Sequence, residues 1–92
     1  CYVNLLGNEA GRMIFDGEIL LAKEGKLLAR NQLLSFQDYQ VFSLFLENTT
    51  QQLAPIQPKE WEFTQASALG LYDYLRKSKS KGFVLSLSGG AD

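Results

Sequence analysis

The sequence predicts an α/β protein made of two partial domains, and three observations indicate this. Residues 1–46 carry short apolar runs separated by glycine-containing turns, which is typical of β-strands. Residues 47–59 are polar and hold both prolines, so we expect a linker there. Residues 60–92 combine a helical apolar period with one further apolar run. We therefore expect the last strands of one domain, a linker, and the first helix and strand of a second domain.

The first part of the chain is predicted to form successive strands. We expect them at residues 2–6, 13–15, 19–22, 27–36 and 41–46. Residues 7–11 are interpreted as a loop, Asp16 and Gly17 as a turn, and residues 23–26 as a hairpin turn with a glycine at the reversal. Apolar residues stand at consecutive positions instead of alternating, which predicts strands covered on both faces.

The second part is predicted to begin with a helix near Pro58 or Lys59, because proline suits a first helical turn. One side of this helix is apolar, and we expect it to dock by that stripe. The stripe consists of Trp61, Ala68, Leu71, Tyr72 and Leu75. The basic residues in 76–81 are interpreted as a helix end, where cations are favourable; a phosphate or RNA contact is the alternative. Gly82 then leads into a strand at residues 83–87.

The composition disfavours several classes of protein. Nine basic and ten acidic residues give a net charge of −1, so we expect no nucleic-acid partner. No apolar run approaches the roughly 18 residues of a membrane span, so we expect no membrane contact. One cysteine and no histidine allow neither an internal disulfide nor a Cys/His metal cluster, and this favours the reducing cytoplasm. We expect Cys1 to be a small buried residue and not a nucleophile.

The residues with the clearest chemistry follow the last predicted strand. They are Ser88, Gly89, Gly90, Ala91 and Asp92. A strand that runs into a serine and two glycines can wrap backbone N–H groups around phosphate oxygens. Glycine permits the backbone angles and the close approach that such a loop needs. An acid just behind it can hold the magnesium ion that accompanies a nucleotide.

This loop resembles the pyrophosphate-binding loop of the ATP pyrophosphatase superfamily, whose signature is SGGxDS. The chain contains no GxxxxGK[ST] motif of the kinase or GTPase type. Upstream, a second set of residues resembles the late strands of a nitrilase-type carbon–nitrogen hydrolase. This set is Tyr2-Val3-Asn4, Gly7, Phe15-Asp16-Gly17 and Gly25-Lys26-Leu27-Leu28-Ala29. With the helix segment Gly70-Leu71-Tyr72-Asp73-Tyr74-Leu75 between them, the order of these parts is similar to that in glutamine-dependent NAD synthetase.

The resemblance implies a fold and a division into domains. Residues 1–46 would be the last strands of a nitrilase-like αββα sandwich that acts as a glutaminase. Residues 47–59 would be the linker, and residues 60–92 the first helix and strand of a doubly wound parallel-sheet synthetase domain. We expect the chain to be a fragment that is inactive alone, with the glutaminase triad upstream of it.

The resemblance also implies an activity. The family is a ligase that amidates deamido-NAD to NAD with ammonia from glutamine, through an adenylated intermediate, and releases AMP and pyrophosphate. ATP and Mg²⁺ are therefore the expected cofactors, and deamido-NAD, ATP and glutamine the small-molecule partners. We expect a homo-oligomer in the cytoplasm.

The same resemblance gives roles to four residues. Ser88 would donate its hydroxyl to a phosphate oxygen, Gly89 and Gly90 would donate backbone N–H groups, and Asp92 would contact magnesium or pyrophosphate. Glu9 and Arg12 have two interpretations, a glutaminase or tunnel contact and a solvated loop, and the solvated loop is favoured.

Two alternatives to this function stay open. One is another glutamine-dependent adenylating amidotransferase or thiolation enzyme with the same loop. The other is a noncatalytic β-rich interaction domain with a glycine tail.

Overall fold

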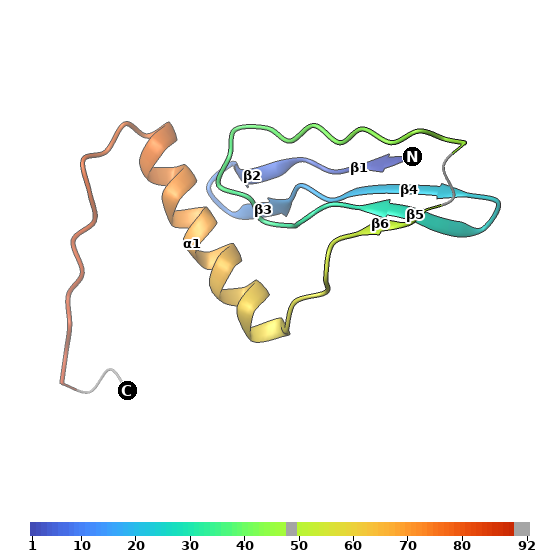
Figure 1. Cartoon of the computed structure of the whole chain (residues 1–92). Helices are drawn as coiled ribbons and strands as arrows, with labels where there is room; N and C mark the ends of the chain where they lie inside the picture. Colours follow the sequence, from blue (N-terminus) through green and yellow to red (C-terminus); the bar gives the residue numbers. More distant parts are fainter. Residues whose placement is uncertain (48–49, 90–92) are drawn as a thin grey trace.

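A computed structural model describes residues 1–47 and 50–89 and shows a mixed α/β chain (Figure 1). Its elements are β1 (Tyr2–Val3), β2 (Leu6–Glu9), β3 (Met13–Asp16), β4 (Ile19–Lys23), β5 (Lys26–Arg30), β6 (Gln52–Leu53) and α1 (Lys59–Lys77). One sheet has the strand order β1-β4-β5-β6, and β2 and β3 form a separate two-stranded sheet. The helix packs across the end of the molecule that carries β2 and β3.

Residues 2–23 form one long antiparallel hairpin, because β1 pairs with β4 and β2 pairs with β3. Between these two ladders the Asn4 N–H donates to the Glu18 carbonyl over 2.9 Å, and the Gly17 N–H donates to the Leu5 carbonyl over 2.7 Å. The expected strand at 2–6 is therefore divided, and its continuation β2 includes glycine and asparagine positions that were predicted to be loop. That prediction was wrong because the pairing with β3 outweighs the weak strand propensity of these residues.

The Asp16 and Gly17 pair lies at a kink inside this hairpin and does not close it. Gly17 has a φ of +70°, which favours glycine, and it is buried. The Asp16 carboxylate accepts hydrogen bonds from the Asn4 side-chain amide and from the Glu18 N–H, both over 2.9 Å. The carboxylate thus holds the two sides of the kink together.

The predicted hairpin turn between β4 and β5 is confirmed. Glu24 and Gly25 are the two turn residues, with φ values of +51° and +75°. Positive φ at both positions matches the turn type whose twist suits a two-residue hairpin. The pairing of Lys23 with Lys26 closes the hairpin next to this turn.

Part of the polar segment 47–59 is built into the sheet. Gln52–Leu53 forms β6, which runs parallel to β5, with Ala29 opposite Gln52. The Ala54 N–H donates to the Arg30 carbonyl over 2.9 Å and extends this pairing by one residue. Backbone hydrogen bonds to β5 stabilise this strand, and they do not depend on the side chains. The sequence therefore shows no hydrophobic period that would predict it.

The helix begins and ends close to where the sequence predicts. Pro58 precedes it, the helix spans Lys59–Lys77, and Ser78 caps its C-terminal end. Within residues 1–47 and 50–89, no helix is both long and apolar enough to cross a membrane.

The predicted docking face of the helix was wrong. Leu71 and Tyr72 are 56% and 40% exposed, whereas Leu69, Gly70 and Asp73 are buried against β2 and β3. The helix packs on the backbone edge of the hairpin, where N–H and C=O groups need hydrogen-bond partners. Small and hydrogen-bonding side chains suit such an edge better than an apolar stripe does.

Two expected strands are not formed and a third is shorter. Residues 41–46 and 83–87 have no strand structure, and β5 ends at Arg30 instead of continuing to residue 36. A strand needs a neighbour for its backbone hydrogen bonds, and none of the described residues pairs with the first two segments. The Asn31 side chain ends β5, because it bonds back to the Ile19 N–H and to the Gly17 carbonyl.

The described residues bury few large apolar side chains. The buried apolar residues are Leu28, Ala29, Leu34 and Leu69. Leu28 and Ala29 are neighbours in β5, and their side chains point to opposite faces of the sheet. The sheet is therefore covered on both faces only around these two residues, and not along every strand as the sequence predicts. Cys1 is exposed, against expectation, because β1 pairs with a single neighbour and carries no covering layer in the described part of the chain.

Candidate functional site

The structure places Ser88 and Gly89 at the exposed end of an extended segment that follows the helix (Figure 1). A side chain added at Gly89 would meet no atom within 4 Å, so the backbone there is open to a ligand. A serine hydroxyl and an open glycine backbone suit phosphate oxygens as hydrogen-bond donors. Gly90 and Asp92 lie outside the described residues, as does the magnesium contact expected at Asp92.

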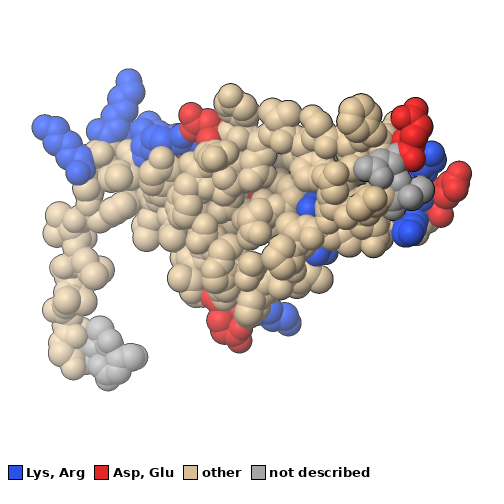
Figure 2. Space-filling model, in the orientation of Figure 1, with Lys and Arg blue, Asp and Glu red and all other residues tan. Residues whose placement is uncertain are grey.

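Basic side chains gather near the C-terminal end of the helix (Figure 2). Two of them already have partners: Arg76 pairs with Asp38 and Asp73, and Lys77 donates to the Asn8 carbonyl. These contacts, together with the helix end itself, support the interpretation of this run as a helix terminus over a phosphate or RNA contact.

Glu9 and Arg12 lie at the tip of the long hairpin. Both are exposed, and the Arg12 N–H donates to the Glu9 carbonyl over 3.3 Å within the turn. Arg12 also borders a hollow of about 260 Å³ between the hairpin tip and the helix. Exposure favours the solvated interpretation of both residues, but Glu9 is the last residue of β2, paired with Met13, and does not belong to a loop.

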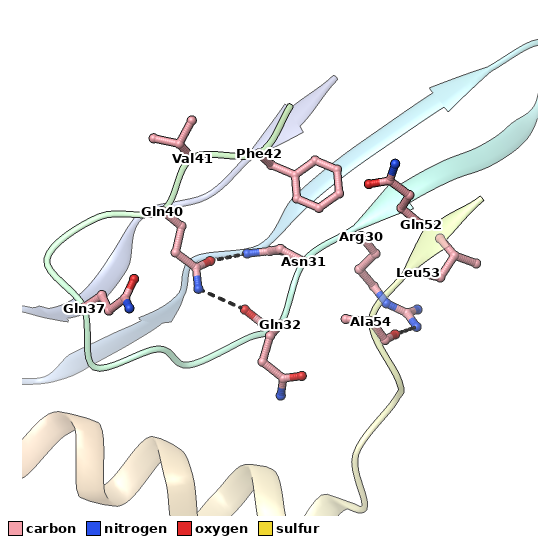
Figure 3. Close-up of a pocket in the computed structure, with 10 residues that line it drawn as sticks. All are labelled: Arg30, Asn31, Gln32, Gln37, Gln40, Val41, Phe42, Gln52, Leu53 and Ala54. Carbon is pink, nitrogen blue, oxygen red and sulfur yellow. Dashed lines mark hydrogen bonds between the residues drawn. The ribbon is translucent and has the colours of Figure 1, made fainter. Parts of the chain in front are cut away.

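A larger cavity, of about 480 Å³, opens between the β5–β6 pair and the segment that follows β5 (Figure 3). It is lined by Arg30, Asn31, Gln32, Gln37, Gln40, Val41, Phe42, Gln52, Leu53 and Ala54. Asn31 and Gln40 are joined by a hydrogen bond on one side, and the Arg30 guanidinium donates to the Ala54 carbonyl on the other.

The chemistry of this cavity is that of a binding groove. Carboxamides and one guanidinium can recognise polar or anionic groups. None of the lining residues carries a carboxylate, a thiol, a hydroxyl or an imidazole, so the lining offers no general base or nucleophile. Sequence reasoning missed the cavity, and the only signal was the density of glutamines between residues 32 and 52.

The best-defined polar cluster joins the helix to the long hairpin, and we call it the Asp73 clamp: Gly7, Asn8, Asp73, Arg76 and Lys77. The Asp73 side chain is 5% exposed, and its Oδ2 accepts the Asn8 N–H over 2.8 Å. Its Oδ1 accepts from the Arg76 guanidinium over 2.9 Å. The Lys77 ammonium lies 3.7 Å from Oδ2 and donates to the Asn8 carbonyl. The buried carboxylate is therefore both paired and hydrogen-bonded, as burial of a charge requires.

Two glycines let the helix approach the hairpin this closely. Gly7 has a φ of +97°, and a Cβ there would overlap the Asp73 Oδ2 atom and lie 3.2 Å from Cγ. A Cβ at Gly70 would lie 2.6 Å from the Ile14 Cδ1 atom. Sequence reasoning included Gly70 and Asp73 in a motif but missed the clamp, because Asn8 and Asp73 are 65 residues apart.

Among residues 1–47 and 50–89, no three Asp, Glu, Cys or His side chains gather closely enough to hold a metal ion.

Comparison with known proteins gives one consistent result. A protein of Synechocystis sp. is 34% identical over 95 residues, one of Homo sapiens 28% over 136, and one of Mus musculus 27% over 136. Each match includes 98–99% of this chain, and each relative is named glutamine-dependent NAD(+) synthetase. No family model and no solved structure matches.

The chain spans less than a fifth of the length of these relatives, 17% to 19%. The human and mouse alignments are longer than the 92 residues of this chain, so these relatives carry additional residues within the matched region. The similarity confirms the resemblance that the sequence predicts.

Proposed function

We propose that this chain, a relative of the glutamine-dependent NAD(+) synthetases, is part of a ligase that amidates deamido-NAD to NAD. Ammonia from glutamine would supply the nitrogen, and ATP would activate the carboxylate of the substrate. The observation that carries the proposal is the extent of the match. It includes 98–99% of the chain, so it contains both the β-rich first part and the Ser-Gly-Gly segment.

The chemistry of the proposal is coherent. A carboxylate oxygen is a poor leaving group, and transfer of AMP to it gives a good one that ammonia can displace. The departing pyrophosphate carries concentrated negative charge, which N–H donors and a metal ion stabilise. Mg²⁺ would supply charge neutralisation when bound.

The chain's own residues would bind and orient the phosphates. Ser88 would donate its hydroxyl, Gly89 and Gly90 their backbone N–H groups, and Asp92 would contact magnesium or pyrophosphate. The Ser-Gly-Gly composition and the match of nearly the whole chain to NAD(+) synthetases support this assignment.

The proposal also assigns parts of the chain to domains. Residues 1–46 would belong to a nitrilase-like glutaminase domain, residues 47–59 to a linker, and residues 60–92 to the synthetase domain. We further propose a homo-oligomeric enzyme of the cytoplasm, with deamido-NAD, ATP and glutamine as its substrates.

The test is the substitution Asp92→Ala in the full-length enzyme. We expect AMP formation from deamido-NAD, ATP and ammonia to be lost, because the contact to magnesium or pyrophosphate is removed, while glutamine hydrolysis persists. Asp38→Ala is the matched control, because Asp38 is also an acid and its side chain is 71% exposed. Full synthesis by Asp92→Ala would contradict the role of Asp92.

A second measurement separates the alternatives. An enzyme with this loop should show a magnesium-dependent rise in melting temperature with ATP, and an interaction domain should show none. Product analysis with deamido-NAD distinguishes an NAD synthetase from another amidotransferase or a thiolation enzyme. Absence of NAD from the wild-type reaction would refute the proposed function.

A further inference from the structure

The Asp73 clamp serves no step of the proposed phosphate chemistry, yet both of its carboxylate oxygens accept hydrogen bonds. It joins β2 of the long hairpin to α1. In the proposed division, these two elements belong to the glutaminase part and the synthetase part.

The clamp holds both backbone groups of a single residue. In an antiparallel strand the N–H and C=O of one residue point to the same side. At Asn8 both point away from β3, toward the helix, where the Asp73 carboxylate accepts the N–H and the Lys77 ammonium donates to the C=O. Asp73 and Lys77 are four residues apart, so they lie on one face of the helix. One helical turn thus takes the place of a neighbouring strand at the edge of the hairpin.

Directional bonds, more than apolar burial, fix this joint. Leu69 is the only apolar residue of the helix that is buried. The Gly7 contact adds a steric limit, because a Cβ there would overlap the Asp73 Oδ2 atom. The helix can make these hydrogen bonds in only one position on the hairpin, whereas a purely apolar contact would let the two elements slide past each other.

We propose that Asp73 and Lys77 are positioning residues that fix the synthetase part on the glutaminase part and so couple glutamine hydrolysis to NAD formation. This inference rests on the proposed function. Ammonia made at one site must reach the other before it is protonated or lost, so the yield of NAD per glutamine depends on how the two parts are held. Individual residues between coupled sites commonly change coupling by two- to thirtyfold, roughly.

The experiment uses the full-length enzyme and the substitutions Asp73→Ala and Lys77→Ala. Three rates are measured: glutamine hydrolysis, NAD formation from ammonia, and NAD formation from glutamine. We expect the glutamine hydrolysed per NAD formed to rise by about 2- to 30-fold in both variants. We expect hydrolysis and ammonia-driven synthesis to stay within about twofold of wild type, because the clamp contains none of the residues assigned to phosphate binding.

Two controls keep the result specific. Asp38 is the other carboxylate partner of Arg76, and its side chain is 71% exposed. Asp38→Asn removes that charge and keeps the Asp73 and Lys77 bonds to Asn8, so it should leave the glutamine hydrolysed per NAD unchanged. Lys77→Arg keeps a cation that can donate to the Asn8 carbonyl and should restore most of the coupling. Lys77 is 52% exposed, so its substitution by alanine tests the inference even if Asp73→Ala fails to fold.

The outcomes separate the two proposals. If Lys77→Ala hydrolyses the same amount of glutamine per NAD formed as wild type, with or without a lower melting temperature, the coupling role is overturned. The proposed function is then left intact. A wild-type enzyme that makes no NAD from ammonia overturns the proposed function itself.

Discussion

Replacing Gly7 by alanine should destabilise the protein through two separable effects. The first is conformational: Gly7 has a φ of +97°, and a side chain in the left-handed region costs about 1–2 kcal/mol. The second is steric, because the new Cβ would overlap the Asp73 Oδ2 atom, which accepts the Asn8 N–H over 2.8 Å. Moving the helix or losing that hydrogen bond costs about 1–3 kcal/mol more. We therefore expect the free energy of unfolding to fall by about 2–5 kcal/mol.

Urea-induced unfolding followed by circular dichroism measures this loss, and Trp61 fluorescence gives a second probe in the helix. Gly25→Ala is the matched control: its φ is +75°, and an added Cβ would meet no atom within 4 Å. The control should show the conformational effect alone. Equal destabilisation by Gly7→Ala and Gly25→Ala would refute the reasoning, because the steric effect would then be absent.

A double variant identifies the atom responsible. The three atoms nearest to a Cβ at position 7 all belong to the Asp73 side chain, so Asp73→Ala removes the nearest obstacle. The loss in Gly7→Ala/Asp73→Ala should therefore be smaller than the sum of the two single losses, as expected for residues in contact. Additive losses would place the clash elsewhere.

Two further substitutions test other contacts by the same urea measurement. Gly70→Ala should change the free energy of unfolding by no more than about 1 kcal/mol. Alanine improves the helix propensity by about that amount, and the Ile14 methyl group must shift to make room for it. A loss above about 3 kcal/mol would show that Ile14 cannot move. Asn31→Ala should cost about 2–4 kcal/mol, because it removes the partners of the Ile19 N–H at 2.7 Å and the Gly17 carbonyl at 2.8 Å. A loss below about 1 kcal/mol would mean that other groups replace both bonds.

Features set by neighbouring residues could be predicted from the sequence. The Glu24 and Gly25 turn, and the helix start after Pro58, depend on the backbone preferences of a few adjacent residues. Both appear in the structure where the sequence predicts them.

Features set by distant residues could not be predicted. Residues 41–46 and 83–87 are apolar enough for strands, but a strand also needs a hydrogen-bonding neighbour, which composition does not reveal. The helix face was wrong for a related reason. Apolar periodicity points to Leu71 and Tyr72, whereas the hairpin accepts Gly70 and Asp73 because of its exposed backbone edge.

The candidate site shows the same division. The composition of residues 88–92 predicts phosphate binding from local chemistry alone, and this stays a prediction, because the supporting strand expected at residues 83–87 is not formed and Gly90 and Asp92 lie outside the described residues. The amide-lined cavity escaped prediction because it forms only when β6 joins β5 and places Gln52 opposite Ala29 and Leu53 opposite Arg30.

The bond from the Asn8 N–H to Asp73 makes this amide a natural reporter of helix detachment. Its acceptor lies on the helix and not on β3, so the ladder of the hairpin does not protect it. In deuterated solvent this proton should exchange whenever the helix lifts away, even while the hairpin stays folded. Its exchange rate would therefore measure how often the two elements separate in the native protein.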